Sequence, residues 1–432
     1  MIYILIAILF LFFLMAIIYE FKKNGFTVVF MSLVWMFVIY CISPFMLLIS
    51  YDEVVSARFI GNFYDLNSII PIIIILIFLG VFLLGSKVSL GTKKYIYLEK
   101  TNDTRIAFGL WVIGILSLSF YIYSYGGLTY FLQNMSQIRS GTADVKNYFA
   151  AFIFSFAKYL NLAFLIIFIK FLKKEFYTLK QYVLLIIILI SCFFSLYLSA
   201  GREDAISFIV SGLAAYYFVK RKIPLISGML VGLFSIFYIV FGKTFLFAMN
   251  NEDFDTQDFI ENKMFDDLEN SFNLVIYEFT HQYLSLVNFL QNEFSFRYFG
   301  DYLYWIFKPF KLLGLDIPDS ISYYNTYLVY GVWDSEIPPG AVAFGYISGG
   351  VFGVIVHAFI LGIIIGAFDR FFNPKKQDNT TLLAYYAFMV SSLTYLISNS
   401  DPALFLQNRL PHFLFIVFIM FIYKVKFKNR WS

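Results

Sequence analysis

The stretch from residue 67 to 85 reads NSIIPIIIILIFLGVFLLG and contains no charged side chain. A helix of this length rises about 1.5 Å per residue and nearly covers the roughly 30 Å of hydrocarbon in a bilayer. The apolar residues do not alternate with polar ones, as they would in the strands of a membrane barrel. The stretch therefore predicts a membrane-spanning helix whose backbone polar groups are satisfied within the helix.

Similar stretches recur along most of the chain. The sequence is 60% hydrophobic and only 14% charged over 432 residues, far from the composition of an ordinary soluble domain. We expect an all-α polytopic membrane protein in which residues 1–432 form a single integral membrane domain. About eleven transmembrane helices are predicted, over residues 2–20, 26–49, 67–85, 106–125, 150–172, 180–199, 203–219, 223–247, 341–368, 381–398 and 404–423.

Basic residues fall at every second loop between these stretches. The clusters are Lys22 and Lys23 and those within 87–105, 170–180, 220–222, 370–376 and 424–430. Because positively charged loops are retained in the cytoplasm, we expect the N-terminus outside and the C-terminus in the cytoplasm. Residues 1–18 are preceded by no basic residue and followed by no Ala-x-Ala site, which predicts an anchor rather than a cleaved signal peptide. These clusters also explain the net charge of +4 without a nucleic-acid partner.

One large extracytoplasmic loop is predicted over residues 248–340, between membrane helices 8 and 9. Its acidic start, 250–270, suits a solvated surface, and its spacing departs from that of a calcium-binding loop. Apolar residues then recur at three- and four-residue steps over 271–292, which predicts an amphipathic helix. Its polar stripe carries Glu278, His281, Gln282, Ser285 and Asn292. Glu278 and His281 face the same way and suit either proton transfer or a simple solvated face.

Aromatic residues interleave with polar ones in the rest of this loop. Arg297 lies within the run 296–302, and Tyr323 and Tyr324 begin the run 323–327. Aromatic rings flanked by polar groups suit the apolar faces of sugars, and they equally suit an interfacial aromatic belt. We therefore count Arg297, Tyr323 and Tyr324 as candidate glycan ligands.

The span that follows the loop is rich in small residues. Glycines at 349, 350, 353, 362 and 366 predict close approach of neighbouring helices. The sequence Pro338-Pro339-Gly340 predicts a rigid break where the helix enters the bilayer. His357, farther along this span, fits a hydrogen-bonded core residue better than a ligand.

Arg202 interrupts two apolar stretches, in the run Ser199-Ala200-Gly201-Arg202-Glu203-Asp204, and the charge distribution places it outside. Because it opens a helix, free backbone N–H groups and the positive end of the helix dipole add to its charge. Such a position attracts phosphate. The alternative is an ion pair, for which Asp401 is a candidate partner.

Four more basic residues belong to the outer half by the same topology. Lys158 and Lys243 lie one to two turns inside their spans and are able to snorkel outward, and Arg139 and Arg409 occupy other outer loops. Structural pairing is the competing interpretation for each. Guanidinium groups bind pyrophosphate oxygens bidentately, so a lipid pyrophosphate at the outer leaflet fits this set of cations.

The chain resembles the bacterial oligosaccharide repeat-unit polymerases of the Wzy, or O-antigen polymerase, type. The motifs that carry the resemblance are Ser199-Ala200-Gly201-Arg202, Phe299-Gly300-Asp301-Tyr302 with Pro309, and Pro338-Pro339-Gly340 followed by Phe344-Gly345-Tyr346 and Gly349-Gly350-x-x-Gly353. Their order along the chain is more specific than any one of them. The chain departs from the family pattern at Lys308-Pro309, where proline-arginine often occurs.

The resemblance implies a metal-independent glycosyltransferase without a cofactor, in the bacterial cytoplasmic (inner) membrane. The growing glycan on undecaprenyl pyrophosphate would be the donor and a single lipid-linked repeat unit the acceptor, with the active site facing outward. Arg202 would stabilise the departing pyrophosphate, with Arg139 and Arg409 in support, and Asp204, Glu278 or His281 would accept the proton. The product would be O-antigen, capsule or another exopolysaccharide, made beside a flippase and a chain-length regulator.

Two other functions share parts of this layout. A flippase or transporter for lipid-linked oligosaccharide would also use outer cations, but it should carry polar residues deep in the membrane and related halves. The sequence contains no internal repeat. A ligase that moves finished glycan to another acceptor would have the same layout as the polymerase.

Overall fold

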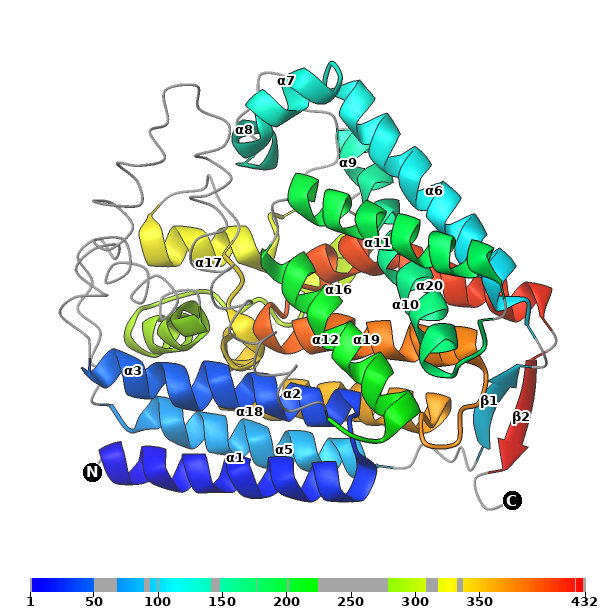
Figure 1. The fold of residues 1–432 in the computed structure, drawn as a ribbon. Coiled ribbons are helices and arrows are strands. Elements are labelled where there is room, and N and C mark those ends of the chain that lie inside the picture. Colours follow the sequence, from blue (N-terminus) through cyan, green and yellow to red (C-terminus); the bar gives the residue numbers. More distant parts are fainter. Residues whose placement is uncertain are drawn as a thin grey trace, which may run out of the picture. The chain divides into compact units, whose positions relative to one another are not determined.

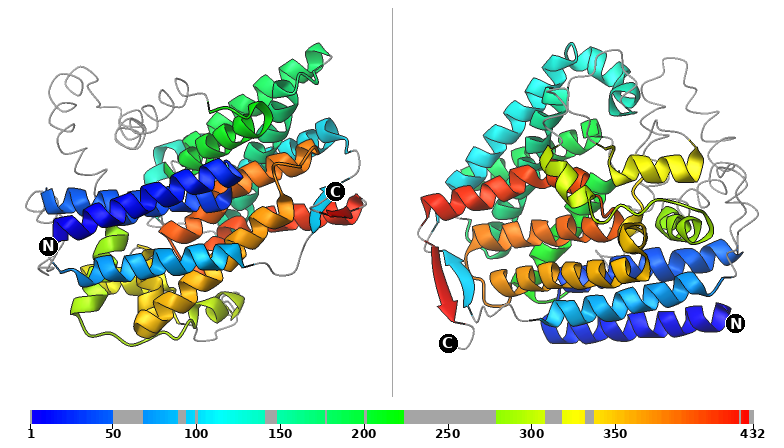
Figure 2. Two further views of the ribbon diagram at one scale, coloured as in Figure 1. Left: turned by 90° about the horizontal axis from the view of Figure 1, so that it is seen from below. Right: turned by 180° about the vertical axis from the view of Figure 1, so that it is seen from behind.

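The computed structural model describes residues 2–49, 68–88, 94–98, 101–140, 148–176, 178–199, 202–223, 279–307, 318–331, 337–423 and 425–429. They form helices, apart from one two-stranded sheet and short connections (Figures 1 and 2). The chain divides into two compact units, which we call unit 1 and unit 2. Unit 1 comprises 1–92, 272–371 and 393–406, and unit 2 comprises 93–271, 372–392 and 407–432.

Within the described ranges, eight helices are long and apolar enough to cross a membrane. They are Ile2–Asn24, Val28–Ile49, Ile70–Lys87, Asp103–Ser124, Phe149–Leu172, Leu179–Ser199, Gly340–Phe372 and Thr380–Ser398. Each coincides with one of the predicted spans, and the protein is an all-α polytopic membrane protein. The predicted spans 203–219 and 404–423 are helical as α12 (Arg202–Lys220) and α20 (Pro402–Ile422), although neither is among the eight. The predicted span 223–247 lies outside the described residues except for its first position.

Unit 1 begins with α1 (Ile2–Asn24) and α2 (Val28–Phe37), which continues through a π-helical turn, η1 (Val38–Ile42), into α3 (Ser43–Ile49). It also contains α5 (Ile70–Lys87), a helical segment 279–291, α16 (Asp301–Phe307), α17 (Ile321–Tyr330) and nearly all of α18 (Gly340–Phe372). α1 packs against both α2 and α5.

Charged residues near the end of α18 join three helix ends of unit 1. The Asp369 carboxylate accepts hydrogen bonds from the backbone N–H groups of Val28 and Val29, both at 3.0 Å, and so caps α2. The neighbouring Arg370 donates to the carbonyl oxygens of Ser86 and Val88 at the end of α5. The start of α2 and the ends of α5 and α18 were predicted to share one side of the membrane, and in unit 1 they lie together.

α18 is not a single straight helix, because it breaks at Gly349 and Gly350. Gly350 has φ 63° and ψ −150°, a combination essentially restricted to glycine. Beyond the break the chain folds back, so that a Cβ atom on Gly345 would lie 2.8 Å from the Cα atom of Val354. The sequence predicted a break only at Pro338–Gly340, and the structure places a second one inside the predicted span 341–368. Residues 351–372 alone rise about 33 Å, enough to cross the hydrocarbon.

The later glycines of α18 pack against α5, as the sequence predicted. A Cβ atom on Gly366 would lie 2.8 Å from the Cα atom of Ser86, and one on Gly362 would lie 2.9 Å from its backbone nitrogen. Backbones that approach this closely leave no room for a side chain between them. Small residues at these positions therefore fix how α18 and α5 meet.

Unit 2 contains the helices from α6 to α12, parts of α19 (Thr380–Ser398) and α20, and the only strands in the described part of the chain. Its elements are β1 (Lys94–Leu98), α6 (Asp103–Ser124), α7 (Leu128–Gln133), α8 (Met135–Ser140), α9 (Tyr148–Phe154), η2 (Ser155–Lys158), α10 (Tyr159–Leu172), α11 (Leu179–Ser199), α12 and β2 (Val425–Asn429). α10 is buried along most of its length, because it packs against α6, α11 and α12.

The basic loops of unit 2 also meet at one end. Lys170 donates to the Thr104 hydroxyl at 2.9 Å, Lys173 to the Asp378 carbonyl at 2.8 Å, and Arg221 to the Lys375 carbonyl at 3.0 Å. β1 and β2, which pair antiparallel, lie within the basic segments 87–105 and 424–430. These loops were predicted to be cytoplasmic, and within unit 2 the contacts bring loops of that predicted side together.

Candidate functional site

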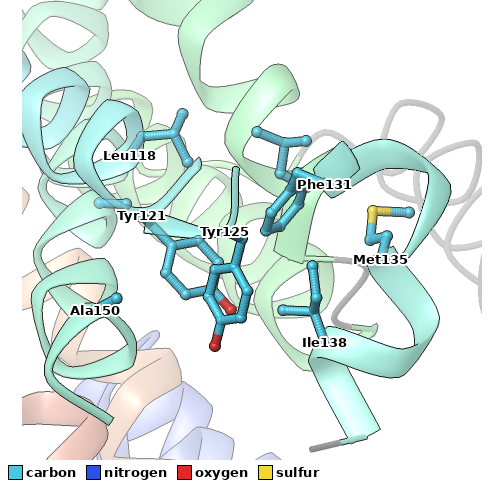
Figure 3. Packing of buried hydrophobic residues seen from close by; sticks show 9 residues of the cluster. Leu118, Tyr121, Tyr125, Phe131, Met135, Ile138 and Ala150 are labelled. Carbon is cyan, nitrogen blue, oxygen red and sulfur yellow. The ribbon is translucent and has the colours of Figure 1, made fainter. Parts of the chain in front are cut away.

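A buried hydrophobic cluster organises the other end of unit 2 (Figure 3). It packs α7 and α8 against α6, α9 and the end of α11 through Leu118, Tyr121, Tyr125, Phe131, Met135, Ile138, Ala150, Ala157 and Leu198. The Tyr121 ring meets Phe131 edge-on at 5.4 Å between centroids and stacks on Phe154 at 4.3 Å. Aromatic pairs of this kind add to the stabilisation from buried area, and here they fix the short helices α7 and α8.

This cluster brings together three chain segments that carry predicted cations. Ile138 precedes Arg139, Ala157 precedes Lys158, and Leu198 lies four residues before Arg202. Arg139 is in α8 and Arg202 is the first residue of α12, although their side chains lie outside the described part of the structure. Lys243 lies outside the described residues altogether.

Two ion pairs connect the first turn of α12 with its neighbours. Lys158 lies 3.2 Å from the Asp204 carboxylate, and Arg409 in α20 forms a salt bridge with Glu203. We call Lys158, Arg409, Glu203 and Asp204 the ion-pair cluster. Carboxylates are favoured in the first turn of a helix by its dipole, so α12 is a natural place for both acids. Structural pairing, the competing interpretation of the outer cations, therefore applies to Lys158 and Arg409. Both of these cations nevertheless meet at the first turn of α12.

Glu203 and His412 were not among the site residues predicted from the sequence. His412 lies one turn after Arg409, is fully buried, and stacks on Phe388 with 4.1 Å between ring centroids. The Tyr159 hydroxyl donates to the Pro411 carbonyl at 2.5 Å and so ties α10 to α20. The three-residue spacing of Arg409 and His412 is the signal that could have drawn attention to this helix.

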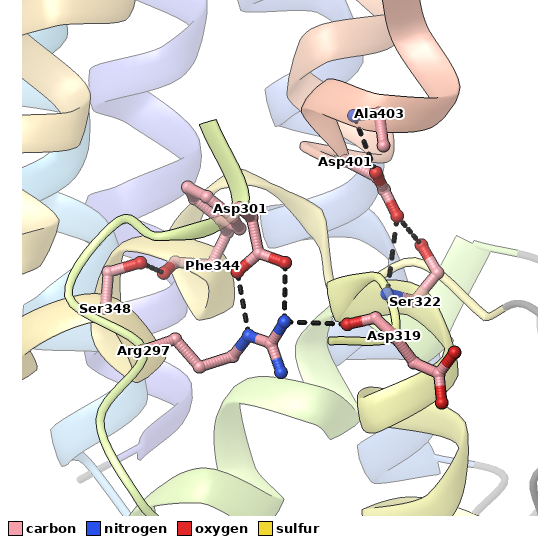
Figure 4. A network of polar contacts seen from close by, with 8 residues as sticks. All are labelled: Arg297, Asp301, Asp319, Ser322, Phe344, Ser348, Asp401 and Ala403. Atoms are coloured by element: carbon pink, nitrogen blue, oxygen red, sulfur yellow. Dashed lines mark hydrogen bonds and ion pairs between the residues drawn. The ribbon is translucent and has the colours of Figure 1, made fainter. Parts of the chain in front are cut away.

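Arg297 belongs to a different network, in unit 1 (Figure 4). Its guanidinium makes two 2.7 Å hydrogen bonds to the Asp301 carboxylate and a third, of 2.8 Å, to the Asp319 carbonyl. The rings of Tyr304 and Tyr324 lie 5.7 and 5.2 Å from it. Burial raises the pKa of the Asp301 carboxyl, while the hydrogen bonds from Arg297 lower it. In this arrangement Arg297 ties the first residue of α16 to Asp319, just before α17, whereas a role in binding glycan stays a prediction.

The remaining predicted residues of the large loop lie in or beside helices. Tyr323 and Tyr324 are half-buried in α17, and His281 is half-buried in the helical segment 279–291, while Glu278 is outside the described residues. The polar stripe predicted for this amphipathic helix is partly wrong, because Gln282 and Ser285 are buried. This segment packs into unit 1, where Asn288 also donates to the Leu328 carbonyl of α17.

Asp401 and His357 are core residues of unit 1. Asp401 accepts a 2.6 Å hydrogen bond from the Ser322 hydroxyl and caps α20 by accepting from the Ala403 backbone (Figure 4). The alternative ion pair between Asp401 and Arg202 stays a prediction, because the Arg202 side chain lies outside the described part of the structure. His357 is buried against the Phe344 ring and lies 3.4 Å from the Tyr302 hydroxyl, as expected for a hydrogen-bonded core histidine.

The Arg297 clamp leads to a stability prediction. Replacing Arg297 with methionine leaves a buried carboxylate without its guanidinium, which costs about 3–5 kcal/mol. We expect a lower melting temperature for purified Arg297→Met protein in detergent, measured by intrinsic fluorescence. The double variant Arg297→Met with Asp301→Leu removes both charges and should recover most of the loss. A single variant as stable as the wild type, or a double variant no better than the single, would contradict the clamp.

Comparison with known proteins identifies no relative. No protein-family model, no curated protein and no solved structure matches this chain.

Proposed function

We propose that the protein polymerises oligosaccharide repeat units linked to undecaprenyl pyrophosphate, as a multi-pass glycosyltransferase of a bacterial cytoplasmic membrane. The N-terminus is outside, the C-terminus is cytoplasmic, and the active site faces outward. The observation that carries the proposal is that the chain segments bearing Arg139, Lys158, Arg202 and Arg409 lie together at one end of unit 2. The basic loops proposed to be cytoplasmic gather at another end of the same unit.

The reaction needs fixed positive charge at the departing group. The acceptor sugar hydroxyl attacks the anomeric carbon of the donor, the bond from that carbon to the pyrophosphate oxygen breaks, and lipid pyrophosphate leaves. Its negative charge grows in the transition state, so cations held in place stabilise that state more than the bound substrate. Arg202 is the principal cation, and Arg139, Lys158, Lys243 and Arg409 bind the diphosphate beside it.

The hydroxyl proton needs an acceptor, and three candidates differ in their surroundings. Asp204 is next to the cations, but its ion pair with Lys158 stabilises the charged carboxylate and weakens it as a base. His281 and Glu278 belong to the large loop, which would bring them to the sugar rather than to the diphosphate. Arg297, Tyr323 and Tyr324 serve the same loop as glycan-binding residues.

A deletion strain distinguishes the proposed polymerase from its alternatives. We expect the strain to display surface glycan of a single repeat unit, resolved by electrophoresis, and a plasmid copy of the gene to restore long chains. Absence of surface glycan would indicate a flippase instead. Long polymer retained on its lipid carrier would indicate a ligase.

A further inference from the structure

The two partners of the Arg409–Glu203 ion pair differ sharply in exposure. The Arg409 side chain is 2% exposed and the Glu203 side chain is 45% exposed. A guanidinium buried to this extent requires an anion beside it, since an uncompensated buried charge is strongly destabilising. Glu203 supplies that anion from a half-exposed position.

The charges around this pair favour a second, stronger anion. Lys158 and Arg409 are balanced by Asp204 and Glu203, and Arg202 adds one more positive charge next to Glu203 in the sequence. Carboxylate and phosphate oxygens use the same bidentate geometry on a guanidinium. A diphosphate carries more charge than a carboxylate, and it would meet the exposed Glu203 before the buried Arg409.

We propose that Glu203 holds the position on Arg409 that a diphosphate oxygen takes when it binds, and that the diphosphate displaces this carboxylate. The inference rests on the proposed function for the diphosphate as the ligand class. The exchange keeps Arg409 paired with an anion at every stage. Because the displaced carboxylate is already half-exposed, it regains water when it moves. Glu203 thus sets the affinity of the site for the headgroup without contacting the reacting atoms.

The proposal predicts that a diphosphate binds more tightly when the negative charge of Glu203 is removed. We would measure binding of inorganic pyrophosphate and, separately, of farnesyl diphosphate to the full chain in detergent by calorimetry. Removal of a unit charge about 5 Å from a bound anion should tighten binding at least about tenfold at an effective dielectric constant near 20. Glu203→Gln should show this gain with both probes. If the affinity for farnesyl diphosphate alone increased, the site would require the lipid. If the affinity for both probes increased, the diphosphate headgroup would suffice.

Two further variants separate the effect from general damage. Asp103→Asn removes a carboxylate that accepts hydrogen bonds from Thr101 and Thr381 beside the basic loops, so it should leave both affinities unchanged. Glu203→Asp keeps the charge but has a shorter reach, so we expect a smaller gain in diphosphate affinity. This variant replaces Glu203→Gln in the test if Glu203→Gln fails to fold.

The proposal would be overturned if the folded Glu203 variants bound diphosphate as weakly as the wild type or more weakly. It would also be overturned if neither the wild type nor any variant bound diphosphate. The deletion strain reports independently on the proposed function. Single repeats in that strain together with no gain from Glu203→Gln would refute the exchange and leave the polymerase standing. A clear gain in diphosphate affinity from Glu203→Gln, together with surface glycan of normal length in the deletion strain, would retain the diphosphate site and refute the polymerase.

Discussion

Arg202→Ala should abolish polymerisation, while the protein still inserts into the membrane and single repeats still reach the surface. The guanidinium is proposed to bind charge that develops on the departing pyrophosphate, and removal of one such donor typically lowers a rate about 10²–10³-fold. The measurement is the chain-length profile of surface glycan in the deletion strain complemented with each variant, with protein levels checked by immunoblotting. Arg202→Lys keeps the charge but not the planar fork, so it should give short chains in reduced amounts.

The same helix supplies the control. Arg221, just beyond the other end of α12, donates to the Lys375 carbonyl and has no part in the proposed site. Arg221→Ala should therefore give normal chain lengths. Long polymer at normal levels from Arg202→Ala would exclude Arg202 from the reaction. Reporter fusions that place the start of α12 in the cytoplasm would exclude the outward-facing site as a whole.

The membrane helices were predictable from the sequence because their signal is local. Apolar runs of sufficient length are visible residue by residue, and eight of them are helices long and apolar enough to span a membrane in the described structure. The break of α18 was not predictable in the same way. Gly349 and Gly350 resemble ordinary small residues of a packed span, and their role emerges only when Gly345 meets Gly353 after the chain turns back.

The candidate site shows the same division between local and distant information. Topology alone indicated that Lys158, Arg202 and Arg409 share a side. The carboxylate that pairs with Arg409 is 206 residues away, and such a partner follows from helix packing rather than from sequence spacing. For Arg297 a local signal existed, because Asp301 lies only four residues later, and in the structure the turn at 298–300 brings the two side chains together. The sequence nevertheless predicted only a glycan ligand at Arg297, and the ion pair with Asp301 was missed.

Gly353→Ala should destabilise the protein strongly. A methyl group at this position would collide with the carbonyl oxygen of Gly345, and that oxygen belongs to the backbone on the other side of the break, which yields at a high cost. Overpacking of this kind costs about 1–3 kcal/mol when side chains absorb it, and more when backbones must separate. The expected result is a low yield of monodisperse protein and a lower melting temperature in detergent.

Gly80 and Gly109 provide matched controls, because each lies within a membrane helix with nothing within 4 Å of an added Cβ atom. Alanine at either site should be neutral or slightly stabilising, since alanine is the better helix former by roughly 1 kcal/mol. Gly345→Ala approaches the same contact from the opposite side, with Val354 as its neighbour, and should resemble Gly353→Ala. If Gly353→Ala melted like Gly80→Ala, α18 would not fold back at this point. The contact between Phe344 and His357, which lie on opposite sides of the break, would then also be absent from the wild-type protein.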